Sequence, residues 1–440
     1  MSKLPVVAIV GRANVGKSSL FNKIYGSREA IVADVAGTTR DNVTRIVEHD
    51  GRSFWLVDTA GLKNNPEDEF EASIQDQITE ATEAADIILV TVEAATAVTE
   101  EDRRVAKMAL KSKKPTILVM NKSDQAHKTD LDHWEKTGIR ERFAVSSIHG
   151  DGLRDLLDHV TESIPKSSAK GSAEKTTIAF VGRPNVGKSK LFNNLANKQQ
   201  AIVADVAGTT RDINAITVKV HGEDVVLLDT AGIRRPGKIG RGVEHFSVLR
   251  TLQAIEQADI CCLLMDVNEL NTAIDQKIAG MVREAGKGLI IIVSKWDTVE
   301  SDAYLRDRLA KEIAMHFQHV WWAPLLFTSS VTGKNVTKIF DMIDQIKTNT
   351  QLEISTSVLN RWLGASVIKH PPAGLKNKHP KLRYATQTAK QPPTITIFGE
   401  HMKFLHWSYK RYLDREFRET WDVSGTPIRM LFKDSKKDKL

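Results

Sequence analysis

Short runs of branched apolar residues recur along the chain and alternate with stretches whose apolar positions follow a helical period. Near the start, such runs lie at Val6–Val10, Phe54–Asp58, Ile87–Val92 and Thr116–Asn121, and a helical stretch at Ser18–Tyr25 follows the first of them. Continuous runs of valine, isoleucine and leucine are typical of strands buried on both faces, and interleaved helices supply the cover. The pattern predicts an α/β fold with a mostly parallel sheet covered by helices.

The same pattern occurs twice because the chain contains an internal repeat. The segment Ala30–Asp41 recurs without change as Ala201–Asp212, at an offset of 171 residues. Repeats at short fixed periods indicate solenoids, whereas one long repeat indicates a duplicated domain. We expect a first domain over 1–164, a flexible linker without large apolar residues over 165–175, a second domain over 176–350 and a smaller domain with a basic tail over 351–440.

A different pattern begins after Thr350 and indicates a small α/β unit. It predicts a helix at Ser355–Trp362, strands at Leu382–Gln387 and Thr394–Phe398, a helix at Met402–Glu419 and a strand at Pro427–Phe432. Two aromatic residues, Tyr384 and Phe398, lie within the predicted strands. Because large aromatic side chains on strands are mostly buried, we expect both to belong to the core.

Each copy of the repeat contains the phosphate-loop pattern G-x-x-x-x-G-K-[ST] between an expected strand and an expected helix. The pattern lies at Gly11–Ser18 and again at Gly182–Ser189. Glycine lets backbone amides turn toward phosphates, and the helix N-terminus adds positive potential. We expect Lys17 and Lys188 to reach the outer phosphates of a nucleotide. The other contacts expected here are Gly11, Asn14, Val15, Gly16, Ser18 and Ser19 in the first copy, and Gly182, Asn185, Val186, Gly187 and Ser189 in the second.

A second motif, Asn-Lys-Ser-Asp ending at Asp124, follows an expected strand and indicates which base is bound. An aspartate carboxylate accepts two hydrogen bonds from N1–H and the 2-amino group of guanine, and adenine offers no such pair of donors. The second copy has Ser294 where the first has an asparagine. The residues expected around the base are Asn121, Lys122, Asp124, Ser146 and Ser147, and in the second copy Ser294, Lys295, Asp297, Ser329 and Ser330.

Oxygen donors for magnesium occur at matching positions of the two copies. A hydroxyl follows each phosphate-loop lysine, a threonine lies in each Gly-Thr-Thr-Arg-Asp segment, and an aspartate opens each Asp-Thr-Ala-Gly segment. Magnesium prefers such hard oxygen ligands, and a threonine of this kind orders a loop only when the third phosphate is present. The expected magnesium ligands are Ser18, Thr39 and Asp58, and Ser189, Thr210 and Asp229; the backbone amides of Gly61 and Gly232 would contact the third phosphate.

These motifs together resemble the Der (EngA) family of bacterial GTPases, which have two tandem G domains and assist assembly of the large ribosomal subunit. The end of the chain resembles that family's KH-like domain through Tyr384–Gln387, Pro392–Pro393, Ser408–Leu413 and Gly425–Ile428. The resemblance implies two P-loop G domains followed by a small KH-like α/β domain. It also implies GTP hydrolysis with Mg²⁺, and the large ribosomal subunit and its rRNA as partners.

The chain departs from the family pattern in the second copy. Ser294 replaces an asparagine, and a serine has a shorter side chain with fewer hydrogen bonds, so we predict weaker nucleotide binding at this site. Lys190 stands where a small residue is usual, and we expect it to face solvent without effect.

Neither copy has the glutamine that many GTPases use to orient the attacking water, because Leu62 and Ile233 occupy its position. Related potassium-dependent GTPases hold a monovalent cation with an asparagine of the phosphate loop, which corresponds to Asn14 and Asn185 here. Our hypothesis is that K⁺ accelerates hydrolysis; the alternative is that these asparagines only form the turn. The residues expected to act in catalysis are Asn14, Lys17, Thr39, Gly61, Asn185, Lys188, Thr210 and Gly232.

Charge is distributed unevenly along the chain. The chain has a net charge of +7, yet residues 351–440 hold 17 Lys/Arg against 8 Asp/Glu. Such a basic excess favours an anionic partner such as RNA. No G-x-x-G clamp of the usual KH kind occurs in this segment, so the RNA prediction depends mainly on the family resemblance.

Several alternatives remain open at this stage. The protein could be a nucleotide-gated RNA- or ribosome-binding scaffold whose hydrolysis is incidental, whereas a tRNA-modifying GTPase and an ATP-dependent kinase fit the duplicated guanine motif poorly. The adjacent Cys261 and Cys262 lie in an apolar run and would face opposite sides of a strand, so we expect buried free thiols. The N-terminus lacks the features of a signal peptide, and no apolar stretch reaches membrane-spanning length. We expect a cytoplasmic monomer.

Overall fold

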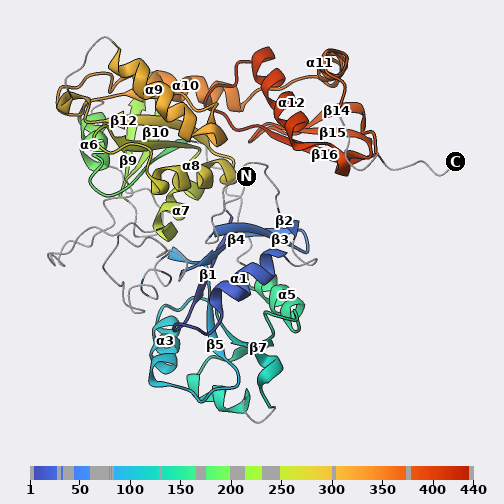
Figure 1. Cartoon of the computed structure of the whole chain (residues 1–440). Helices are drawn as coiled ribbons and strands as arrows, with labels where there is room; N and C mark the ends of the chain where they lie inside the picture. Colours follow the sequence, from blue (N-terminus) through green and yellow to red (C-terminus); the bar gives the residue numbers. More distant parts are fainter. Residues whose placement is uncertain are drawn as a thin grey trace. The chain divides into compact units, whose positions relative to one another are not determined.

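The computed structural model describes residues 4–26, 31–32, 44–59, 79, 81, 84–127, 131–164, 175–198, 214–229, 248–299, 304–372 and 378–435. These residues form two compact units. One contains the first sheet with its helices, together with residues 248–256, and the other contains the second and third sheets (Figure 1).

The first sheet has the strand order β2-β3-β4-β1-β5-β6-β7, with β1, β4, β5, β6 and β7 parallel and β2 and β3 antiparallel to their neighbours. Its elements are β1 (Val6–Val10), α1 (Lys17–Gly26), β2 (Ile31–Val32), β3 (Thr44–His49), β4 (Arg52–Asp58), β5 (Ile87–Glu93), α3 (Glu100–Lys111), β6 (Thr116–Asn121), η2 (Ser123–Gln125), η3 (His133–Thr137), β7 (Glu141–Val145) and α5 (Leu153–Ser163). Alternate strand residues such as Val7 and Ile9 pack with α1 and α5 in one core. Helix α3 lies on the other side of the sheet from α1 and α5 (Figure 1).

The second sheet repeats this arrangement in the order β13-β12-β11-β8-β10-β9, with only β9 antiparallel among the described strands. In chain order this part of the chain contains β8 (Thr176–Val181), α6 (Lys188–Lys198), β9 (Asn214–Val220), β10 (Glu223–Asp229), α7 (Val248–Gln257), β11 (Ile260–Asp266), α8 (Ala273–Ala285), β12 (Gly288–Ser294), η4 (Trp296–Thr298), α9 (Leu305–His316), η5 (Gln318–Val320), β13 (Leu325–Phe327) and α10 (Lys338–Thr350). Of these, residues 248–256 of α7 belong to the unit with the first sheet. Cys261 and Cys262 are both free and buried. The α/β fold class and the two buried free thiols are confirmed.

The third sheet has the order β14-β15-β16, with β14–β15 antiparallel and β15–β16 parallel. Its elements are α11 (Thr356–Lys369), β14 (Lys381–Ala389), β15 (Thr394–Glu400), η6 (Met402–Phe404), α12 (Trp407–Thr420) and β16 (Arg429–Asp434). One core joins the two helices to one face of the sheet through residues such as Leu363, Ile397 and Leu413. The small C-terminal α/β domain predicted from the sequence is therefore present.

The single helix expected at Met402–Glu419 is wrong at its start. A short 3-10 turn, η6, is followed by Leu405 and His406 in extended conformation, and α12 begins only at Trp407. The His406 imidazole accepts a hydrogen bond from the Ser408 amide at 3.3 Å. A side chain that caps the helix end satisfies an amide that has no partner inside the helix, and this sets where α12 starts.

The expected core position of Tyr384 is also wrong, because its side chain is 45% exposed. The pairing of β14 with β15 shifts between Leu382 and Tyr384, as in a β-bulge. Leu382 packs against the core, and an extra residue moves the next side chains to the opposite face. Tyr384 therefore stacks on Phe398 on the outer face of the sheet, with ring centroids 4.7 Å apart.

The C-terminal α/β domain packs directly on the domain that contains the second sheet. The Gly425 amide donates to Trp322 O at 2.9 Å, and Gly425 O accepts from the Leu289 amide at 2.9 Å. The Arg418 guanidinium lies 5.3 Å from the centre of the Trp322 ring, a cation–π contact. Because Gly425 bonds to the backbone of Leu289 in β12 and of Trp322, the two parts are joined by backbone hydrogen bonds as well as by side-chain contacts.

Candidate functional site

The loop between β1 and α1 wraps around the side chain of Lys17. Its ammonium donates to the carbonyl oxygens of Gly11 and Arg12, at 2.8 and 2.6 Å. Burial lowers the pKa of Lys17 from its usual value, and Asp58 opposes this effect. The lysine is thus held at the centre of a loop whose next residues open a helix, where backbone amides and the helix N-terminus favour an anion.

Two glycines of this loop have no room for a side chain. A Cβ on Gly11 would lie 2.3 Å from Thr91 O, and a Cβ on Gly16 would lie 2.3 Å from Asn121 Nδ2. Both also have positive φ, 151° and 88°. The loop therefore packs against the ends of β5 and β6, which brings the phosphate loop and the base motif together.

An arginine that is not among the predicted site residues holds the other side of the loop. Arg12 lies 3.3 Å from Asp102, a buried carboxylate that also takes part in the capping box at the start of α3. In the second copy, Arg183 pairs in the same way with Asp275 at 3.3 Å. The repeated Gly-Arg dipeptide was the available sequence signal for this anchor.

A hydroxyl and a carboxylate meet next to the phosphate loop. Ser18 Oγ donates to Asp58 Oδ2 at 2.6 Å, and Asp58 is fully buried at the end of β4. Two hard oxygen donors at this separation, beside Lys17, match the ligand chemistry of Mg²⁺. These described residues therefore fit a magnesium ion at the first site.

Asn121 connects the phosphate loop to the loop that follows β7. Its Nδ2 donates to Val15 O at 2.9 Å, and its Oδ1 accepts from the Ser147 amide and hydroxyl at 3.2 and 2.6 Å. Lys122 follows with a positive φ of 59° and pairs with Glu93 at 2.9 Å. Three predicted segments of the first site, the phosphate loop, the base motif and the loop after β7, are thereby joined in one hydrogen-bonded network.

The carboxylate of Asp124 stands exposed beside this network. A hydrogen bond from Ser146 lowers the pKa of Asp124 from its usual value. The group is therefore ionised at neutral pH and acts only as an acceptor. An exposed acceptor-only carboxylate is suited to a pair of N–H donors on one base edge.

The phosphate loop of the second copy has the same geometry. The Lys188 ammonium donates to the carbonyl oxygens of Gly182 and Arg183, at 2.9 and 2.5 Å. Asn185 and Gly187 have positive φ, 63° and 96°, close to the values of Asn14 and Gly16 in the first loop. The backbone of the phosphate site is therefore built twice.

The base motif of the second copy is connected differently. Ser294 Oγ donates to Val186 O at 2.6 Å and to Met265 O at 3.0 Å, so the serine still holds the phosphate loop. No hydrogen bond from Ser294 to Ser330 is present in the described part of the chain. Ser330 O accepts from Asn194 at 2.8 Å, while Asp297 accepts from Ser329 at 2.5 Å, as Asp124 does from Ser146 in the first copy.

We predict that Ser294→Asn strengthens nucleotide binding at the second site by about tenfold, since one or two added hydrogen bonds contribute about 1 kcal/mol each. There is room for the longer side chain beside Gly187, because a Cβ on that glycine would meet only Ser294 Oγ, at 4.0 Å. The matching space beside Gly16 is filled by the Asn121 amide, at 2.3 Å. Titration with a fluorescent GDP, in the full chain carrying Lys17→Ala, measures the effect. Asn121→Ser in the full chain carrying Lys188→Ala is the reciprocal control and should weaken the first site. Equal affinities for Ser294 and its asparagine variant would contradict the prediction.

Some of the remaining predicted site residues belong to the described part of the chain, and the others lie outside it. Lys190 is exposed, as expected, and so are Ser19, Asn14 and Asn185. Asn14 has a φ of 66°, a left-handed conformation that asparagine tolerates better than most residues, so the turn-forming alternative accounts for its presence. Lys295 pairs with Asp266 at 2.6 Å, and Asp229 ends β10. Thr39, Gly61, Thr210 and Gly232, with Leu62 and Ile233, lie outside the described residues.

Comparison with known proteins identifies the class. The family described as "50S ribosome-binding GTPase" matches residues 6–122 and 177–295, which contain the two phosphate loops and the first two residues of each base motif. The family described as "KH-domain-like of EngA bacterial GTPase enzymes, C-terminal" matches residues 353–433. Two guanine-nucleotide sites and this third domain define a GTPase with tandem G domains.

Full-length relatives specify the family further. The chain is 41% identical to "GTPase Der" of Chloroflexus aggregans over 98% of both chains. It is 40% identical to "GTPase Der" of Gemmatimonas aurantiaca over 98% of this chain and 99% of that one. The chain belongs to the Der (EngA) family. Among the described residues, no helix has the length and apolar character needed to cross a membrane.

Proposed function

We propose that this Der-family GTPase binds and hydrolyses GTP at both sites, and that the bound nucleotide switches its docking on rRNA-containing particles during assembly of the large ribosomal subunit. The observation that carries the proposal is the Asn121 network, which links the phosphate loop to the base motif and to the loop after β7. The matched family's description as a 50S ribosome-binding GTPase supports the ribosomal partner. We also propose the domain boundaries 1–164, 176–350 and 351–440, with 165–175 as a linker.

The proposed roles are supported by the geometry of the described residues and by the family resemblance. Lys17 and Lys188 neutralise the outer phosphates from within their loops, and Asp124 and Asp297 select guanine. Mg²⁺ would be held by Ser18 and Asp58 and would neutralise charge between the outer phosphates when bound. By the same proposal Thr39 would complete the coordination of Mg²⁺ when the third phosphate is present, and the Gly61 amide would contact that phosphate. In the second site Ser189, Asp229 and Thr210 would hold Mg²⁺, and the Gly232 amide would contact the third phosphate.

A monovalent cation beside Asn14 and Asn185 is part of the proposal because neither copy has a glutamine after the Asp-Thr-Ala-Gly segment. A fixed positive charge near the transferring phosphate stabilises the transition state and contributes on the order of 10³-fold when an arginine supplies it. The exposed position of both asparagines leaves their side chains accessible to an ion.

We predict that GTP turnover is at least tenfold faster in KCl than in NaCl at equal ionic strength, if an ion does part of the work of an arginine. Phosphate release under single-turnover conditions measures the rate. Asn14→Ala and Asn185→Ala should each remove the difference at one site. Equal rates in the two salts would contradict the prediction and would mean that the two asparagines only form the turn of their loops.

The proposed partners place the protein in the cytoplasm, where ribosomes assemble, and we propose that it works as a monomer. Co-sedimentation with purified large subunits in GDP, GTP and a nonhydrolysable analogue tests the function. We expect binding in the analogue and release in GDP, together with faster hydrolysis when subunits are present. Nucleotide-independent binding would refute the switch.

The second candidate function is a nucleotide-gated scaffold with incidental hydrolysis. The absence of a glutamine at Leu62 and Ile233 favours it, because apolar side chains cannot orient water. Analogue-dependent binding without any stimulation of hydrolysis by subunits would favour this candidate.

A further inference from the structure

The two G domains carry different charge on the same face. In the first G domain this face is the groove between α3 and η3, and in the second it is the groove between α8 and η5. The helices α3 and α8 are equivalent because each begins with the same capping box, Thr99 with Asp102 and Thr272 with Asp275. The turns η3 and η5 precede equivalent strands, β7 and β13. The charges at equivalent positions of the two faces can therefore be compared directly.

In the second G domain this face is covered by the C-terminal domain. Arg429 donates to Glu284 O at 2.9 Å, where α8 ends. Arg283 occupies the groove and donates to His319 O at 2.9 Å; burial lowers the pKa of its guanidinium, and Asp414 of the C-terminal domain opposes that effect. The face is thus a docking surface in one copy of the fold.

In the first G domain the same face is basic. Arg103, Lys107 and Lys111 lie one helical turn apart along α3, about 6 Å between successive residues. Lys136 flanks the groove from η3, and all four side chains are exposed. Their counterparts in the second domain are uncharged or acidic: Gln276, Gly280, Glu284 and His319.

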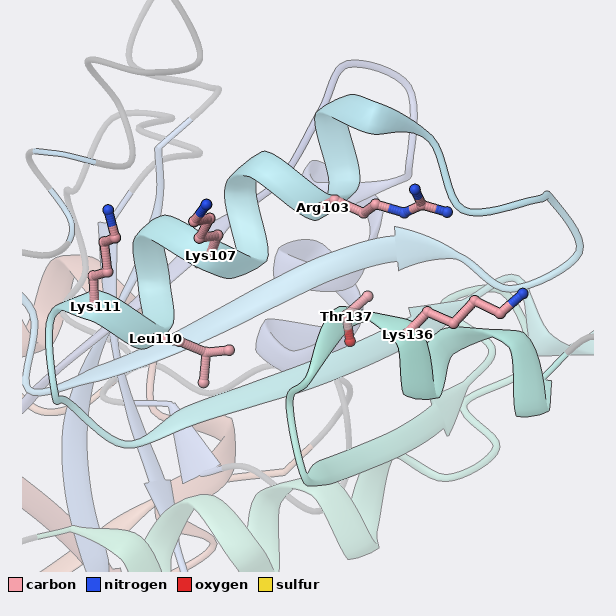
Figure 2. A pocket seen from close by; sticks show the side chains of 6 residues that line it. All are labelled: Arg103, Lys107, Leu110, Lys111, Lys136 and Thr137. Carbon is pink, nitrogen blue, oxygen red and sulfur yellow. The ribbon is translucent and has the colours of Figure 1, made fainter.

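The groove itself is lined by these four residues with Leu110 and Thr137 between them, and its volume is about 450 Å³ (Figure 2). Figure 2 shows Arg103 and Lys136 extending in the same direction from opposite sides of the groove. In the described part of the chain none of the four cations forms an ion pair. The nearby carboxylate of Glu135 is paired with Arg142 at 2.8 Å.

From this contrast we infer that the α3–η3 face of the first G domain binds the phosphate backbone of RNA. Unpaired cations on both sides of a groove match a polyanion, whose binding releases counterions. The chain's own C-terminal domain does not fit here, because residues 351–440 carry 17 Lys/Arg against 8 Asp/Glu and would be repelled. The inference rests on the proposed function in taking RNA as the partner, and it adds a second RNA contact at a stated place.

The test uses the full chain and a mixed-sequence RNA duplex of 20 base pairs, titrated at several salt concentrations. The variant Arg103→Gln/Lys107→Gln/Lys136→Gln should bind at least tenfold more weakly at low salt. The slope of log K against log salt should fall by about two to three, as expected for the loss of three phosphate contacts. GTP turnover should stay unchanged, because these residues lie outside the nucleotide site.

The matched control is Arg306→Gln/Arg308→Gln/Lys311→Gln on α9, which removes three exposed cations from the second G domain. An α3–η3 variant that binds RNA like this control would overturn the inference. Competition by polyglutamate as strong as that by RNA would also overturn it, since the face would then suit acidic proteins. Co-sedimentation of the wild type with large subunits is measured separately: failure there refutes the proposed function, whereas failure of the salt test alone refutes only the RNA site.

Discussion

Replacing Asp124 by asparagine is expected to move the first site from guanine to xanthine nucleotides. The carboxylate only accepts hydrogen bonds, because a bond from Ser146 keeps its pKa low. An amide would place a donor against the 2-amino group of guanine, and the unpaired donors should weaken GDP binding by about a hundredfold or more. Xanthine has an oxygen at that position and would accept from the new amide.

Fluorescent GDP and XDP titrations of the full chain measure this switch. Wild type should bind no XDP, whereas Asp124→Asn should gain one XDP site and keep one GDP site. Asp132→Asn, an exposed aspartate of the same domain, is the control and should change neither affinity. Retention of two GDP sites in Asp124→Asn would show that this carboxylate does not select the base.

Replacing Gly425 by alanine is expected to release the C-terminal domain from the second G domain. Gly425 has a φ of 73°, and a Cβ there would lie 2.3 Å from Ile346 Cγ1 in the core of that G domain. Left-handed strain and overpacking together cost about 2–4 kcal/mol. The backbone hydrogen bonds of Gly425 with Trp322 and Leu289 would then open more often.

Hydrogen exchange at the amides of Leu289 and Gly425 reports this opening directly, and about 2–4 kcal/mol corresponds to roughly 30- to 1,000-fold faster exchange. Gly364→Ala is the control, because that glycine is in α11 and a Cβ there meets nothing within 4 Å. It should leave exchange at Leu289 unchanged and stabilise the helix by up to about 1 kcal/mol. Unchanged exchange in Gly425→Ala would mean that the contact tolerates a side chain.

The parts of the site that could be predicted are those fixed by short stretches of sequence. The phosphate loops need glycine at set positions because backbone from β5 or β11 passes within van der Waals distance, and the sequence shows those glycines directly. Buried parallel strands appear as unbroken apolar runs, which is why the two sheets could be predicted from pattern alone.

The parts that could not be predicted depend on contacts between distant segments. The face of β14 on which Tyr384 lies depends on a shift in the pairing of β14 with β15. The alternation of side chains along a strand sequence does not reveal such a shift. The start of α12 depends on an imidazole cap at His406, a residue that is not a usual capping signal. The anchor from Arg12 to Asp102 joins residues 90 positions apart.

The shorter side chain at Ser294 should affect the rate of nucleotide release as well as the affinity. Without a bond from β12 to Ser330, the loop over the base keeps its bonds from Asn194 to Ser330 O and from Ser329 to Asp297 but lacks one that the first site has, so we expect nucleotide to leave the second site sooner than the first. A site that exchanges quickly follows the surrounding ratio of GTP to GDP, whereas a site that exchanges slowly retains the nucleotide it last bound. On one chain, the second site would then respond to the cellular supply of GTP, and the first site would set how long a bound state lasts.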